Sequence, residues 1–158
     1  MFPQQPWVWI LLGVVLAAGG ALLWAWLLRR RPRRASIERA RKLFHLQRER
    51  LEHRFFVLAS KSGKPRGLEW VDCEFEDDVA FARDRHTGRL RALVAVTIRF
   101  RAVEGGGMED NPNVGNLKAA SAIFYLDGED WSADGKAYMN LSPAETIDRY
   151  RQELEVVD

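Results

Sequence analysis

Apolar and polar positions divide the chain into an unbroken apolar run, a stretch with helical spacing and a series of alternating stretches. Residues 7–28 carry no charged side chain. A run of about 22 apolar residues is long enough to cross a bilayer as a helix. We therefore predict a transmembrane helix over 7–28, preceded by a short extracytoplasmic N-terminus over 1–6.

Aromatic and basic residues flank this apolar run. Tryptophan is enriched where membrane helices cross the interface, and here the run is bounded by Trp7, Trp9, Trp24 and Trp26. A basic juxtamembrane linker follows over 29–35, containing Arg29, Arg30, Arg31, Arg33 and Arg34. Residues 1–6 contain no Lys or Arg, so the positive-inside rule predicts an outer N-terminus and a cytoplasmic domain. We expect a single-pass protein of the inner (plasma) membrane.

The apolar run also has a face of small residues and a second interpretation as a signal peptide. Small residues recur every four positions at Gly13, Ala17, Ala21 and Ala25, a spacing that lets two helices approach closely. This face is a candidate for self-association into a homodimer, although apolar spans are rich in Gly and Ala in any case. A cleaved signal peptide is the other interpretation of the run, but it would carry its positive charge before the apolar residues.

A second helix is predicted within the soluble domain, 36–158. Pro32 predicts a break or kink, after which Ser36 can cap the new helix. Its apolar positions recur at helical spacing: Ile37, Ala40, Phe44, Leu51, Phe55 and Leu58. The apolar face is expected to pack on a sheet. Alternatively the helix lies among lipid headgroups, with Arg41, Arg48 and Arg50 as candidate lipid contacts.

Period-two alternation predicts an antiparallel sheet of about five strands, over 68–76, 79–84, 90–103, 117–126 and 131–141. The strand 90–103 is the clearest. In the strand 68–76, alternation puts Val71, Cys73 and Phe75 on one face and Trp70, Asp72 and Glu74 on the other. Gly135 interrupts the last strand and indicates a bulge. A long Gly- and Asn-rich loop covers 104–116.

A final helix is predicted from Ser142, where Ser, Pro and Glu form a capping box. Its apolar stripe comprises Ile147, Tyr150 and Leu154.

The charge of the chain is unevenly distributed. Residues 29–66 contain fourteen Lys and Arg against three acids, whereas residues 67–158 contain ten against nineteen. A basic segment beside a membrane span indicates anionic lipid as a partner. Nucleic acid is not expected as a partner, because the acidic globular part would repel phosphate.

Two groups of polar residues are candidates for catalysis or metal binding, and each also has a structural interpretation. Asp84 and His86 could form an acid–base pair, but both lie in a predicted turn, where such residues are common. The acids Asp127, Glu129, Asp130 and Asp134 lack the spacing of a calcium loop. The sequence therefore predicts no catalytic residue, no cofactor and no metal site.

Other chemistry-bearing residues have ordinary structural interpretations. The glycines 105–107 lack the Lys-Ser or Lys-Thr of a phosphate loop and indicate a tight or flexible turn. Cys73 is expected to be a buried, inert thiol; as the only cysteine it cannot form an intrachain disulfide, which fits a reducing compartment. Trp70, Tyr125 and Tyr138 either line a pocket or pack across strands.

The order of elements over 36–141, with a helix held by a curved sheet and a long central strand, resembles the cystatin-like and NTF2-like α+β group. The chain is also similar to bacterial single-span membrane proteins for which no activity is known. The resemblance implies either a protein-interaction surface or a ligand-binding cone. No residue matches the acid–base pair of NTF2-like enzymes.

Two hypotheses of function follow. The first is a membrane-anchored, non-enzymatic binding or scaffolding module whose partner is another protein. The second is an NTF2-like cone that binds or transforms a small molecule, with polar residues such as Tyr125 or Asp72 inside it.

Overall fold

The computed structural model describes residues 6–62 and 67–157, with few of the side chains before residue 36. Its elements are α1 (Pro6–Ser62), β1 (Leu68–Asp84), β2 (Leu90–Ala102), β3 (Lys118–Asp127), β4 (Asp130–Met139), α2 (Pro143–Arg149) and β5 (Leu154–Val156). The chain forms two compact units, Met1–Lys42 and Leu43–Asp158. The predicted α+β class is confirmed.

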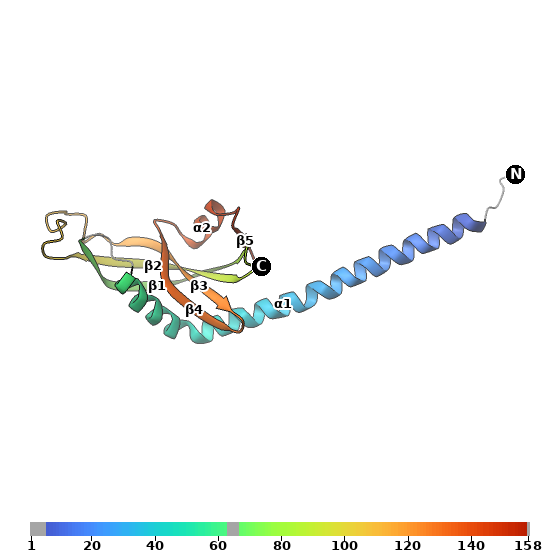
Figure 1. Ribbon diagram of the computed structural model, residues 1–158, viewed down its shortest axis with the longest axis horizontal. Coiled ribbons are helices and arrows are strands. Elements are labelled where there is room, and N and C mark those ends of the chain that lie inside the picture. The colour runs from blue at the N-terminus through green and yellow to red at the C-terminus, as the bar shows by residue number, and fades with distance from the viewer. Residues whose placement is uncertain (1–5, 63–66, 158) are drawn as a thin grey trace. The chain divides into compact units, whose positions relative to one another are not determined.

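The five strands form one antiparallel sheet in the order β4-β3-β2-β1-β5. The sheet is curled, with the last turns of α1 along one face and α2 on the other (Figure 1). As predicted, β2 is central, and it is buried over most of its length, because both of its faces are covered there; Arg99 and Arg101 near its end are exposed.

Aromatic side chains fill the space between the sheet and the end of α1. Phe44 and Phe55 of this helix are fully buried, and so is Phe124 of β3. The ring centroid of Phe124 lies 5.4 Å from that of Phe44 and 5.9 Å from that of Phe55. Trp131 lies 5.0 Å from Phe44 in edge-on geometry, which is favourable for aromatic pairs. The prediction that this helix packs on the sheet is confirmed.

A second core lies on the opposite face, under α2 and β5. It joins five buried residues, Ala82, Leu93, Ile123, Ile147 and Leu154. The predicted capping box holds the start of α2. The Glu145 amide donates to Ser142 Oγ at 3.3 Å, and the Ser142 amide donates to Glu145 Oε2 at 2.8 Å.

The predicted helix break at Pro32 is wrong, and so is the cap at Ser36. The helix α1 runs without interruption from Pro6 to Ser62 and includes residues 29–35. A proline removes only one backbone donor from a helix. The arginines and alanine around it are good helix formers, so the helix continues through this position.

The predicted division of residues 68–84 into two strands is also wrong. Residues 77–78 do not form a connection; they lie in one strand, β1, which has a register shift between Phe75 and Val79. A second shift between Trp70 and Asp72 moves Trp70 to the face of Phe75, because Val71 is the extra residue. The predicted opposition of Trp70 and Phe75 is therefore wrong.

Two predictions near the C-terminus have different outcomes. The bulge at Gly135 is confirmed, since this residue has φ 77° and the β3–β4 register shifts there. The extension of the last helix to Leu154 is wrong. Tyr150 is the C-cap of α2. The Leu154 amide donates to the Tyr150 carbonyl at 2.7 Å, but Leu154 begins β5 and pairs with Asp84 of β1.

Candidate functional site

A hollow of about 990 Å³ runs beside the edge strand β4. Seven consecutive residues, 134–140, line it together with residues from β1, β2 and β3 and with Glu153, which follows α2. We call this feature the β4 hollow. Trp70, Tyr125 and Tyr138, which the sequence indicated as candidate pocket residues, all line it, whereas Asp72 does not.

The polar end of the β4 hollow is built on an ion pair between Arg91 and Asp84. Asp84 is buried, and its Oδ1 accepts the backbone N–H groups of His86 and Thr87, each at 2.8 Å. Its Oδ2 accepts a hydrogen bond from Nη2 of Arg91. The pKa of Asp84 is held below its usual value, first by the Thr87 amide and then by the His86 amide and the charge of Arg91. Asp84 therefore stabilises a turn. Its hydrogen bond with His86 is donated by the backbone N–H of His86 and does not involve the imidazole.

Arg91 is only partly satisfied by this arrangement. Its Nε is buried and has no hydrogen-bond partner among the described residues. Its guanidinium carbon lies 5.6 Å from the ring centroid of Tyr125. A buried donor without an acceptor costs about 1–3 kcal/mol. The sequence analysis missed Arg91. No signal in the sequence distinguished it, because Arg99 and Arg101 share its face of β2.

Two tyrosines flank this guanidinium. Burial raises the pKa of Tyr125 to about 12, and the negative charge of Asp134 adds to the rise. Burial also raises the pKa of Tyr138, an effect that the charge of Arg91 partly offsets. The ring of Tyr138 packs on that of Tyr150, with centroids 4.6 Å apart. Both phenols are therefore neutral at pH 7 and able to donate a hydrogen bond.

The other end of the β4 hollow is largely apolar. Trp70 and Phe100 lie across β1 and β2 with ring centroids 5.2 Å apart, and Met139 belongs to the same lining. The register places these two rings on the α1 face of the sheet and the pair Arg91–Tyr125 on the α2 face. The two ends thus lie on opposite faces and meet along β4.

For most of the residues predicted to lie at the membrane, the structure describes the backbone but not the side chain. This applies to Trp7, Trp9, Trp26, Gly13, Ala17, Ala21, Arg29, Arg30, Arg31, Arg33 and Arg34, whose backbone is helical. Trp24 is described and is 68% exposed. Within the described part of the chain, no helix has a long enough apolar stretch to cross a membrane.

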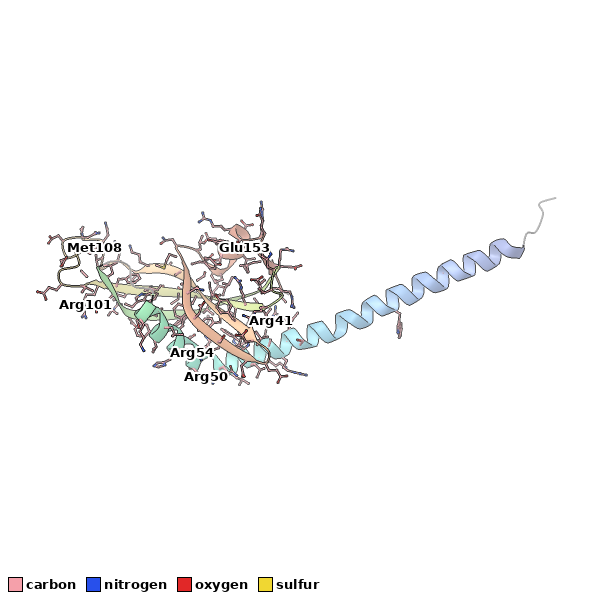
Figure 2. All side chains as sticks on the ribbon, viewed as in Figure 1. Arg41, Arg50, Arg54, Arg101, Met108 and Glu153 are labelled. Carbon is pink, nitrogen blue, oxygen red and sulfur yellow. The ribbon has the colours of Figure 1, made fainter. Side chains whose placement is uncertain are left out.

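The three candidate lipid contacts differ in their surroundings. Arg48 is bound within the domain, with Nε 2.6 Å from Glu52 and Nη1 3.2 Å from Asp77. Arg41 pairs with Glu38 at 3.3 Å. Arg50 is exposed on α1 and donates only to Gln47, at 3.1 Å, among the described residues (Figure 2). Of the three, Arg50 is thus the most accessible to an outside partner.

The remaining candidates have structural roles. Cys73 is half-buried rather than fully buried as predicted, but burial and the charge of Asp72 raise the pKa of its thiol to about 12, which agrees with an inert group. Asp127 pairs with Arg89, and Asp134 pairs with Lys136, each at 3.0 Å. No group of three or more metal-ligating side chains occurs among the residues that the structure describes.

The glycine-rich loop binds a carboxylate of its own chain. The backbone amide of Glu109 itself, followed by those of Gly105, Met108 and Gly106, holds the pKa of the Glu109 carboxyl below its usual value. Gly105 and Gly107 have φ near 75°, which favours glycine. The loop is therefore a tight turn that satisfies its own amides.

Comparisons of the chain with known protein families, with curated proteins and with solved structures find no match. The functional interpretation therefore rests on the residues and their geometry.

Proposed function

We propose that the chain is a membrane-anchored, non-enzymatic binding or scaffolding module whose α+β domain faces the cytoplasm. The observation that carries the proposal is the uncharged run 7–28, which ends directly before five arginines and belongs to the helix that enters the domain. An apolar segment of this length favours a bilayer, and the arginines favour retention on its inner side.

The packing of the domain supports binding at its surface. Phe44, Phe55 and Phe124 occupy the space between α1 and the sheet, where an NTF2-like cone would hold its ligand. A ligand there would have to displace fully buried rings, at a cost of several kcal/mol. The interior cone is therefore the less favoured alternative, and the partner of the module is expected to contact the outside of the domain.

The charge distribution supports anionic lipid as one partner. The arginines of 29–35 would lie at the inner leaflet, where each contributes about 1 kcal/mol. Arg50 is free to add to this contact, whereas Arg48 already has Glu52 and Asp77 as partners. The second partner would be another protein, and the small-residue face at Gly13, Ala17 and Ala21 is a candidate for homodimer contacts.

Membrane anchoring is tested by extraction of the full chain from cells with alkaline carbonate. The chain is expected to stay with the membrane pellet and to be released by detergent, because only detergent dissolves a transmembrane helix. The matched control lacks residues 7–28 and retains the rest, and it should appear in the soluble fraction. Release of the full chain by carbonate alone would contradict the anchor.

A further inference from the structure

We infer that the β4 hollow binds a small molecule that carries a carboxylate on a flat apolar body, with the carboxylate at Arg91 and Tyr138. The inference deepens the binding part of the proposed function and does not depend on the membrane anchor. It rests on two observations: the polar groups that the protein leaves unsatisfied and the aromatic lining.

The unsatisfied buried group in the β4 hollow is a donor. Asp84 occupies one nitrogen of Arg91 with a single oxygen, because its other oxygen is bound to turn amides. The Nε of Arg91 is buried without an acceptor among the described residues. The Nε–H lies on the same edge of the guanidinium as Nη2, which Asp84 already holds, so an oxyanion would bind there through the unpaired Nε–H.

The tyrosines extend this donor set and restrict the ligand. The neutral hydroxyl of Tyr138, which interacts with Arg91, can donate to a second ligand oxygen. Its ring is fixed against Tyr150, so little side-chain entropy is lost on binding. The Tyr125 hydroxyl interacts with Asp134 and is thus already engaged. Recognition of an oxyanion therefore depends mainly on Arg91 and Tyr138.

The lining and size indicate the rest of the ligand. Cavities of roughly 300–1,000 Å³ with apolar and aromatic walls and a few polar groups are typical of small-molecule sites. The volume of about 990 Å³ includes both ends of the β4 hollow, and the lining of the Arg91 end includes the ring of Tyr125 and the side chain of Ile123. An aromatic or alicyclic body would bury its surface on these groups.

The charged side chains along the hollow are nearly balanced, because Arg91 pairs with Asp84 and Lys136 pairs with Asp134, so an anion would be recognised by hydrogen bonds rather than by net charge. Lys118 has no ion pair among the described residues, but its pairing with Ile98 places it on the α1 face of the sheet, opposite to Arg91. Glu153 is exposed and lies at the same hollow, where solvent screens its charge.

An added strand from another protein is a less suitable occupant. Such a strand would need a regular free edge on β4. The edge is instead bulged at Gly135 and has Asp134 and Lys136 on either side of the bulge. Bulges and charges of this kind are common on edges that are protected from pairing.

The test is calorimetric titration of the full chain, purified in dodecyl maltoside, with 2-naphthoate and with uncharged 2-naphthalenemethanol. Protein-free micelles provide the blank. The naphthoate should bind at least about tenfold more tightly than the alcohol, because only the carboxylate makes charge-assisted hydrogen bonds. Equal affinity for both probes, or no heat above the blank at millimolar concentration, would overturn the inference.

Variants locate the binding site. Arg91→Lys keeps a cation for Asp84 but lacks the Nε donor, so it should weaken naphthoate binding about tenfold or more and leave the alcohol unaffected. Arg89→Lys is the matched control, since Arg89 pairs with Asp127 outside the lining, and it should change neither affinity. Tyr138→Phe keeps the ring and should also weaken naphthoate binding; it decides the outcome if Arg91→Lys does not fold.

Naphthoate binding that a folded Arg91→Lys and Tyr138→Phe both leave unchanged would place the probe elsewhere and refute the site. Retained binding by a chain lacking residues 7–28 would separate this result from any failure of the membrane anchor.

Discussion

Leu51 and Leu46 lie five residues apart on α1 and differ almost completely in exposure, at 1% and 82%. Replacement of each by alanine removes the same atoms. At the buried position the loss combines the transfer free energy with a cavity term, about 2–5 kcal/mol in total. At the exposed position the change should stay within about 0.5 kcal/mol. Since small domains are stable by about 5–15 kcal/mol, Leu51→Ala should remove a large part of the free energy of unfolding.

The assay is denaturant unfolding of the full chain in detergent, followed by circular dichroism. The Leu51→Ala midpoint should fall strongly with an unchanged slope, while the Leu46→Ala curve should overlay that of the unaltered chain. Equal losses from both variants, or a loss below about 1 kcal/mol from Leu51→Ala, would refute the assigned face of α1. They would also reopen the question of a ligand cavity between this helix and the sheet.

Three further predictions concern single side chains. Because the pKa of Asp84 is lowered in the folded state, the ionised carboxylate stabilises the fold above about pH 4, and this stabilisation is lost as the pH falls through the folded-state pKa. Asp84→Asn should therefore flatten the acid side of a curve of unfolding free energy against pH, measured by denaturant unfolding. Gly135→Ala should lower the melting temperature more than Gly128→Ala. Both glycines have positive φ, but a Cβ at residue 135 would lie 2.5 Å from the α1 backbone, whereas the space at residue 128 is open. Equal effects would mean that β4 and α1 do not touch at Gly135. Arg48→Gln should cost about 1 kcal/mol in a thermal melt, and Arg50→Gln should cost nothing measurable, because only Arg48 is bound to acids of the domain.

The parts of the fold that could be predicted from the sequence are those governed by periodicity and capping. The alternation over 90–103 placed Val94, Val96 and Ile98 on one face, and all three are buried. Ser142 and Glu145 identified the start of α2, since a capping box depends on residues only three positions apart. The bulge at Gly135 followed from the lack of a side chain in mid-strand.

The errors arose where pairing between distant segments overrode the local pattern. Residues 77–78 have the composition of a turn, yet pairing with β2 on both sides keeps them within β1. The bulge at Val71 reversed the face of Trp70, which period-two alternation cannot represent. Leu154 fits a helical stripe, but it lies in β5, where it pairs with Asp84 at the edge of β1.

The candidate site was only partly accessible from the sequence. Trp70, Tyr125 and Tyr138 could be named because aromatics on strands are obvious pocket candidates. Arg91 could not, because its importance depends on the burial of its Nε and on the single oxygen that Asp84 offers. Both depend on three-dimensional arrangement, which residue type and spacing do not contain.

The most direct test of the proposed function is the side of the membrane on which the domain lies. An alkaline phosphatase that is active only after export, fused behind Asp158 of the full chain, reports this location in bacterial cells. The fusion is expected to be expressed and inactive, because the arginines at 29–34 should hold the C-terminal side in the cytoplasm. Strong phosphatase activity would place the domain outside and contradict both the proposed orientation and the contact with inner-leaflet lipid.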